Sequence, residues 1–139
     1  MKIGVPKEIK RHEYRVGMTP GCARTYIEQG HSVAVESGAG MGAGFADDDY
    51  RRVDAEVLPD VQQLYAQSEM IVKVKEPLPD EFGLFSQGQI LYTYLHLAAN
   101  KPLAELLISR KIIALGYETI QEDDGTLPCL LPMSEIAGR

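Results

Sequence analysis

Three titratable residues, Lys75, His96 and Glu118, each come directly after a short apolar run. Such runs predict buried strands, and the carboxyl ends of parallel strands meet at one edge of a sheet. We therefore expect the three side chains to converge on one rim. A histidine exchanges protons near neutral pH, which suits a general acid or base, and a lysine can hold a carbonyl oxygen or a carboxylate. This rim is the first candidate site.

Arg15 is a further candidate, in the polar segment 7–18. A guanidinium group matches a carboxylate through two parallel hydrogen bonds, so this side chain can hold a carboxylic acid. Several other cations, including Lys10 and Arg11, lie in the same segment. Chemistry alone does not single out Arg15, and a solvated cationic loop is the alternative.

Each rim residue also has an ordinary structural explanation. A histidine can bond to a neighbouring backbone group, and most lysines are solvated. Lys73 competes with Lys75, because its alternation with Val72 and Val74 is compatible with an exposed strand edge. The residues by themselves leave these alternatives open.

The glycine-rich run 38–44 approximates the dinucleotide-binding fingerprint after a strand. That fingerprint must open directly into a helix, so that a pyrophosphate meets the helix N-terminus. Here Phe45 and Ala46 intervene, and the three carboxylates of residues 47–49 would repel a phosphate. We interpret the run as a flexible loop that allows close backbone packing.

Strands and helices are expected to alternate along the whole chain. Thr19, Asp47, Asp60 and Asn100 are suitable N-caps for four helices, with Pro20 in the first turn of one of them. The alternation predicts an α/β domain with a mostly parallel sheet and helices on both faces, Rossmann-like or flavodoxin-like in its three layers. The expected strands are 2–6, 32–36, 55–58, 70–74, 90–95 and 111–115.

Composition limits the classes of partner. The chain has 139 residues and a net charge of -6, which argues against nucleic acid and anionic membranes as main partners. No apolar run approaches the length of a membrane span, and the first residues have no signal-peptide pattern. Cys22 and Cys129 are far apart, as expected for reduced thiols in a cytoplasmic protein. The three histidines have no metal-ligand spacing, so no metal site is expected.

The last residues predict a helix that begins near Met133 or Ser134 and stops within two turns. A domain seldom ends just after a helix begins. We therefore expect the chain to be the N-terminal piece of a longer protein.

Long motifs, in order along the chain, carry a resemblance to a known family. They are MKIGVPKEIKRHEYRV, ESGAGMGAGFADDDY, IVKVKEPLPDE, ILYTYLHLAA and LPMSEIAGR. Together they resemble the N-terminal domain of the alanine dehydrogenase/pyridine nucleotide transhydrogenase family, and within it the alanine dehydrogenases. The resemblance covers essentially all 139 residues. One departure is Asp54, where the family usually has a glycine before the alanine; it affects a helix end.

The resemblance implies a role for four residues. Arg15 and Lys75 match positions that hold pyruvate or alanine, His96 matches the catalytic acid/base, and Ser134 matches a position that touches NAD. The family oxidises L-alanine with NAD to an imine, which water converts to pyruvate and ammonia, and also runs the reverse reaction. Residues 1–139 would then be the substrate-binding and catalytic domain of a two-domain, homo-oligomeric (hexameric) enzyme. The NAD-binding domain and a catalytic aspartate are expected beyond residue 139, so the chain alone should be inactive.

Other classes remain as alternatives. Transhydrogenase first domains usually lack the histidine motif, so His96 argues against them, and saccharopine dehydrogenases differ at the motifs of both Lys75 and His96. A non-enzymatic flavodoxin-like module is a second class, although a receiver domain would need an acidic pair where this chain has Lys7 and Glu8. A third possibility is that the chain acts only in assembly of an oligomer.

Overall fold

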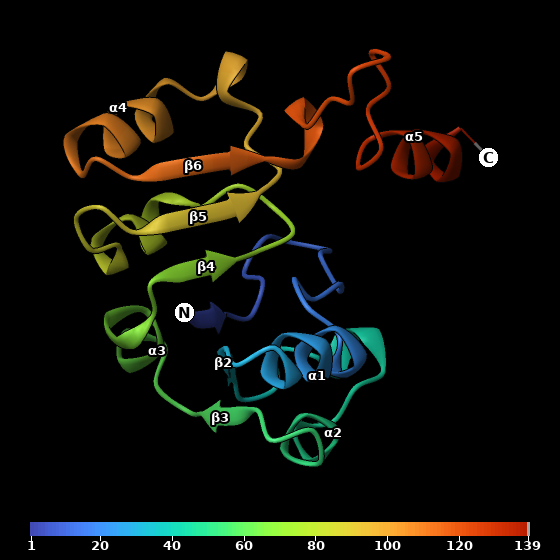
Figure 1. The fold of residues 1–139 in the computed structure, drawn as a ribbon. Helices are drawn as coiled ribbons and strands as arrows, with labels where there is room; N and C mark the ends of the chain where they lie inside the picture. The colour runs from blue at the N-terminus through green and yellow to red at the C-terminus, as the bar shows by residue number, and fades with distance from the viewer. Residues whose placement is uncertain (139) are drawn as a thin grey trace.

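A computed structural model describes residues 1–138 of the chain. Six parallel strands form one sheet in the order β3-β2-β1-β4-β5-β6 (Figure 1). The α/β class and the six expected strands are confirmed, with ends that differ by a few residues. The strands are β1 (Lys2–Val5), β2 (Ser32–Glu36), β3 (Glu56–Leu58), β4 (Met70–Val72), β5 (Ile90–Thr93) and β6 (Ile113–Gly116).

Helices cover both faces of the sheet. The α-helices are α1 (Pro20–Glu28), α2 (Asp47–Arg51), α3 (Val61–Gln67), α4 (Lys101–Ser109) and α5 (Leu131–Ala137). Short 3₁₀ segments are η1 (Met41–Ala43), η2 (Pro79–Leu84), η3 (Leu97–Ala99) and η4 (Tyr117–Thr119). One core cluster joins α1 and α2 to one face through Ala23 and Tyr50; a second joins α3 and α4 to the opposite face through Leu64 and Leu103.

Three predicted caps begin their helices as expected. The side chains of Thr19, Asp60 and Asn100 accept hydrogen bonds from backbone N–H groups in the first turns of α1, α3 and α4. The fourth prediction was wrong, because Asp47 lies inside α2 and its carboxylate turns back to accept from Ser37 Oγ at 2.6 Å and Gly38 N at 2.8 Å. The side-chain hydrogen bond from Ser37 is the largest cause that lowers the pKa of Asp47.

The glycine-rich run packs closely, as predicted, but contains the 3₁₀ turn η1. A Cβ atom on Gly42 would lie 2.7 Å from the carbonyl oxygen of Tyr14, so glycine is required where this run meets the segment that carries Arg15. The first amide of the run, Gly38 N–H, is already bonded to the carboxylate of Asp47. These contacts fix the loop and leave it unsuited to a phosphate.

The strand order changes direction at β1. This strand pairs with β2 on one side and with β4 on the other, so the segments that leave β1 and β4 diverge. Ligands of open α/β sheets bind in the crevice outside the carboxyl ends of the strands at such a point. Residues 6–18 follow β1 and residues 73–78 follow β4. The crevice between these two segments is the natural place for a site.

Candidate functional site

The candidate residues lie at the carboxyl-end edge of the sheet. Lys75 follows β4, His96 follows β5, and Glu118 lies in η4 after β6. Arg15 comes from the segment between β1 and α1. Figure 1 shows α5, which carries Ser134, beyond the arrowheads of β5 and β6. The predicted convergence of strand ends on one rim is therefore observed.

Several hollows open on this edge, and two neighbouring ones are lined by the candidate residues; another, of about 610 Å³, is lined by His96, Glu118 and residues of η3 but by neither Arg15 nor Lys75. Lys75, His96, Glu118 and Ser134 all line one hollow of about 240 Å³. Arg15 lines the other, which has a volume of about 440 Å³. The two hollows share Tyr94 and Met133, which line both. All four predicted site residues thus border one continuous region.

His96 is held by two carboxylates. Its backbone adopts a left-handed conformation with φ of 47°, which is uncommon for a non-glycine residue. Glu118 Oε1 accepts the N–H groups of both Leu95 and His96 at 2.8 Å and stabilises this bend. On the ring, Nδ1 lies 3.2 Å from Glu76 Oε2. No hydrogen bond to Nε2 is present within residues 1–138, so this nitrogen is available for proton transfer.

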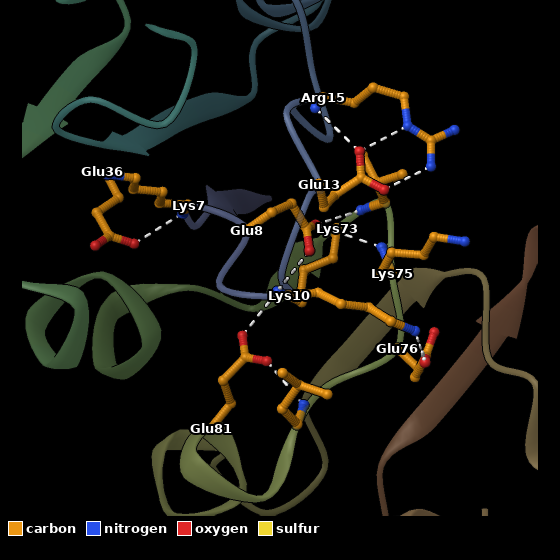
Figure 2. Close-up of polar contacts among 12 residues, drawn as sticks. Lys7, Glu8, Lys10, Glu13, Arg15, Glu36, Lys73, Lys75, Glu76 and Glu81 are labelled. Carbon is orange, nitrogen blue, oxygen red and sulfur yellow. Dashed lines mark hydrogen bonds and ion pairs between the residues drawn. The ribbon is translucent and has the colours of Figure 1, made fainter. Parts of the chain in front are cut away.

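Glu76 links the ring to a second charge. Its other carboxylate oxygen pairs with Lys10 Nζ (Figure 2). Burial acts to raise the pKa of Glu76, yet hydrogen bonds from Lys10, its own backbone amide and His96 bring this pKa below its usual value. Glu76 is therefore an anion that accepts from Nδ1–H, a hydrogen bond that selects the tautomer with the lone pair on Nε2.

Arg15 is oriented by Glu13. The carboxylate of Glu13 accepts from Arg15 Nε at 2.7 Å and from Nη2 at 2.6 Å, a two-bond pairing that fixes the guanidinium plane (Figure 2). These side-chain bonds are the main cause that lowers the pKa of Glu13. The remaining terminal nitrogen, Nη1, lies 3.7 Å from Met133 Sδ at the wall shared by the two hollows. It can therefore still donate to a ligand there.

Lys73 and Lys75 have opposite environments. Lys73 is only 1% exposed, and its Nζ lies 2.7 Å from Glu81 Oε1 and 3.3 Å from Glu8 Oε2. The expectation of an exposed strand edge was wrong, because Lys73 continues the path of a central strand and is covered on both faces. Its ammonium charge is balanced inside the protein by these two carboxylates. Lys75 is half-buried and borders the smaller hollow, so it is the lysine that can reach a ligand.

Ser134 reaches the site through α5. Tyr94, directly after β5, ties down the segment that leads into α5, since its hydroxyl donates to Cys129 O at 2.8 Å. The ring of Tyr94 also stacks near His96, with ring centroids 6.2 Å apart. Tyr94 and Met133 were not predicted as site residues. The available signal was their position in two of the quoted motifs, where Tyr94 lies two residues before His96 and Met133 lies directly before Ser134.

Residues 1–138 contain neither a metal-ligand cluster nor a membrane-spanning helix. No cluster of His, Cys, Asp or Glu side chains there has the grouping of a metal site. No helix in that range has the length and apolar character needed to cross a membrane.

Known proteins match this chain over its full length. The model of the family "Alanine dehydrogenase/PNT, N-terminal domain" matches residues 4–137. Alanine dehydrogenase of Methanococcus maripaludis is 50% identical over 139 residues, which are 100% of this chain and 37% of that protein. Alanine dehydrogenase of Staphylococcus haemolyticus is 48% identical over the same shares of the two chains. The chain spans a little over a third of these relatives.

Solved structures point to the same family. An L-alanine dehydrogenase superposes with a TM-score of 0.96 at 52% identity, covering 100% of this chain and 38% of that one. A transhydrogenase from Sinorhizobium meliloti has a TM-score of 0.79 at 21% identity over 85% of this chain and 35% of its own, a likeness of fold alone. With the family match over nearly every residue, the chain belongs to the alanine dehydrogenase/pyridine nucleotide transhydrogenase N-terminal domain family.

Proposed function

We propose that this chain is the substrate-binding and catalytic domain of an NAD-dependent alanine dehydrogenase, which interconverts L-alanine with pyruvate and ammonia. The observation that carries the proposal is the single hollow bordered by Lys75, His96 and Ser134, with Arg15 beside it. The relatives of about 50% identity that are named alanine dehydrogenase support it.

The two cations suit a 2-oxo acid. Arg15 offers Nη1 to a carboxylate while Glu13 holds the rest of its guanidinium group. Lys75 can then donate to the second carboxylate oxygen or to the carbonyl oxygen. Fixed positive charge next to that oxygen stabilises the negative charge that develops when the carbonyl or imine carbon is attacked. The two cations therefore bind and polarise the same small substrate.

His96 is proposed as the acid/base. With Nδ1 bonded to the Glu76 anion, Nε2 can take a proton from the water that attacks the imine and return it later. Glu118 keeps the ring over the hollow by holding the backbone. The half-exposed ring, 52% open, can exchange the proton with solvent between turnovers.

NAD would be the hydride acceptor, but the residues here do not form its pyrophosphate site. The only glycine-rich run in the sequence contains a 3₁₀ turn and does not open into an α-helix, and its first amide is bonded to Asp47. We propose that Ser134 supplies one contact to the cofactor. The NAD-binding domain would lie beyond residue 139, in the part of the relatives that this chain does not cover.

Assembly and location complete the proposal. Ile108, Ile113 and Leu115 are exposed large apolar side chains on α4 and the edge strand β6. Such a surface supports a homo-oligomer, hexameric as the family resemblance implies. The free thiols of Cys22 and Cys129 support a reducing, cytoplasmic location.

The alternatives explain less of the geometry. A binding module would use Arg15 and Lys75 but has no need for a histidine held by Glu76 and Glu118. A transhydrogenase-type domain shares the fold, yet the usual absence of the histidine motif in that group leaves His96 unexplained.

The test is His96→Ala in the full-length protein, meaning this chain with the remaining domain proposed above. Loss of a general acid/base should lower alanine-dependent reduction of NAD by about 100-fold or more. His31→Ala is the matched control, because His31 lies before β2 at the opposite edge of the sheet and should leave turnover unchanged. A His96→Ala protein with near-normal turnover would refute the catalytic role.

A further inference from the structure

A buried network of charges lies beneath Lys75, where β1 and β4 end side by side. Lys73 is at its centre and contacts Glu8 and Glu81, both of which are also buried (Figure 2). Glu81 comes from η2 and further accepts from Tyr65 Oη at 3.3 Å and from Leu78 N at 2.8 Å. Lys73 borders the larger hollow beside Arg15, but its ammonium group is paired with the two carboxylates, and none of these groups has a role in the proposed reaction.

Glu8 performs two tasks with its two oxygens. Oε2 faces Lys73 Nζ at 3.3 Å. Oε1 accepts the N–H of Val74 at 2.7 Å and, more weakly, that of Lys75 at 3.4 Å. Because Glu8 belongs to the segment after β1, its carboxylate joins the exits of the two central strands. Figure 2 shows the Lys75 side chain extending away from this contact.

Stability alone does not explain such an arrangement. Buried ion pairs are expensive to desolvate, and replacing them with apolar residues is often neutral or even stabilising. Burial raises the pKa of Glu8 above its usual value, although the Lys73 charge and the amide bonds oppose this shift. The network does give something that apolar packing cannot, which is a fixed backbone direction at residues 74 and 75.

We propose that Glu8 is a positioning residue for Lys75: clamped by Lys73, it fixes the backbone of Val74 and Lys75 so that the Lys75 ammonium group meets the substrate. This inference rests on the proposed function, since it assumes that Lys75 binds pyruvate. Glu8 itself touches no substrate. Its effect should therefore vanish when the ammonium group of Lys75 is absent.

The substitution Glu8→Gln tests the clamp with almost no change of shape. An amide has one acceptor oxygen and one NH₂ donor. If the oxygen faces the Val74 and Lys75 amides, the NH₂ group opposes the Lys73 ammonium; if it flips, the NH₂ group opposes the Val74 N–H. Either way two donors face each other. Adding Lys73→Met removes one of those donors, and Glu81→Gln then avoids an unpaired buried carboxylate where Lys73 paired with Glu81, so this triple variant can again hold the backbone.

The experiment is a double-mutant cycle in the full-length protein, with the KM for pyruvate as the readout. Glu8→Gln should raise this KM about tenfold in the presence of Lys75 and by less than about twofold in a Lys75→Ala background. Glu8→Gln/Lys73→Met/Glu81→Gln should return the KM to within about threefold of the parent. Glu56→Gln is the control, because Glu56 is exposed on β3, accepts from Gln67 Nε2 at 3.1 Å and lies apart from the network.

The outcomes separate the two proposals. If Lys75→Ala alone left the kinetics unchanged, the substrate role of Lys75 would be refuted and the positioning role with it. If Lys75→Ala raised the KM but Glu8→Gln acted by the same factor in both backgrounds, only the positioning role would be overturned. Should Glu8→Gln fail to fold, Glu8→Asp keeps the buried charge but withdraws the oxygen by one methylene. The same cycle with Glu8→Asp must then show the same dependence on Lys75.

Discussion

Glu76 and His96 come from the ends of adjacent strands, and their side chains meet 3.2 Å apart across the edge of the sheet. The pair exists because β4 and β5 are parallel neighbours, which brings the residues after both strands to the same side. Lys10 holds the outer oxygen of Glu76, so the carboxylate has little freedom to turn away from the ring.

We predict that Glu76→Ala in the full-length protein lowers turnover by about tenfold with little change in the KM for pyruvate. The substitution removes the acceptor that orients the His96 ring but leaves Arg15 and Lys75, the two cations proposed to bind the substrate, in place. Steady-state kinetics measures this split. Glu105→Ala, on the exposed side of α4, is the control. A large change in KM with unchanged turnover would place Glu76 in substrate binding instead.

Arg15→Ala and Lys75→Ala should each raise the KM for pyruvate by about 10- to 100-fold and also slow the reaction. Each loses a charge-assisted hydrogen bond worth about 1.5–3 kcal/mol. Arg11→Ala should do little, because Arg11 is exposed and borders neither hollow. If KM and turnover were unchanged in the Arg15→Ala and Lys75→Ala variants, both residues would be ordinary solvated surface residues with no role in substrate binding.

The pairing of Glu13 with Arg15 should make part of the stability depend on pH. The pKa of Glu13 is lowered in the folded chain, mainly by its hydrogen bonds from Arg15. The folded state therefore binds this proton more weakly than the unfolded state. The contribution is present above the ordinary pKa of a glutamate and is lost as the pH falls through the lowered value. Urea unfolding of the chain and of Glu13→Gln should give midpoints that differ near neutral pH and converge at acidic pH, below the lowered pKa of Glu13. A difference between the two unfolding midpoints that stayed the same at every pH would contradict this linkage between protonation and stability.

Asp54→Gly should stabilise the chain by about 0.5 kcal/mol. Asp54 has a φ of 62°, in the left-handed region where a side chain is strained and glycine is not. The resemblance noted above, in which the family usually has glycine here, agrees with this geometry. Asp48→Gly makes the same chemical change inside α2, where it should lower stability. Thermal unfolding measures both, and a loss of stability in Asp54→Gly would show that the left-handed backbone costs nothing here.

The 139-residue chain should bind NAD weakly and turn over no alanine. Ser134 can offer one hydrogen bond, worth about 0.5–1.5 kcal/mol, whereas micromolar affinity requires about 8 kcal/mol. Pyruvate binding can persist, because Arg15 and Lys75 both lie in this chain. Calorimetry with each ligand separately is the measurement. Micromolar binding of NAD would contradict this prediction, because it would require a nucleotide site within this chain, for example at the run 38–44.

The sequence was informative where structure depends on neighbours along the chain. Apolar runs located the strands, and Thr19, Asp60 and Asn100 located helix starts, because caps act within a few residues. The rim followed from topology, since parallel strands bring their ends together. The burial of Lys73 was not predictable in this way. Its partners Glu8 and Glu81 come from different segments, and the alternation of charged and apolar residues is the same in an exposed strand and in a buried, paired one.

The central place of β1 has a consequence for how the chain folds. β1 is the only element that hydrogen-bonds to both halves of the described sheet, because β2 and β4 each pair with it and not with one another. In the pairing of β1 with β4, Ile3 lies opposite Met70. The middle of the sheet can therefore form only when residues far apart in the sequence come together, and folding steps that need such non-local pairing are slow. Deleting residues 2–5 would leave a β2-β3 ribbon and a β4-β5-β6 sheet, each with an open apolar edge. Those two edges are where the unfolded or truncated chain would aggregate.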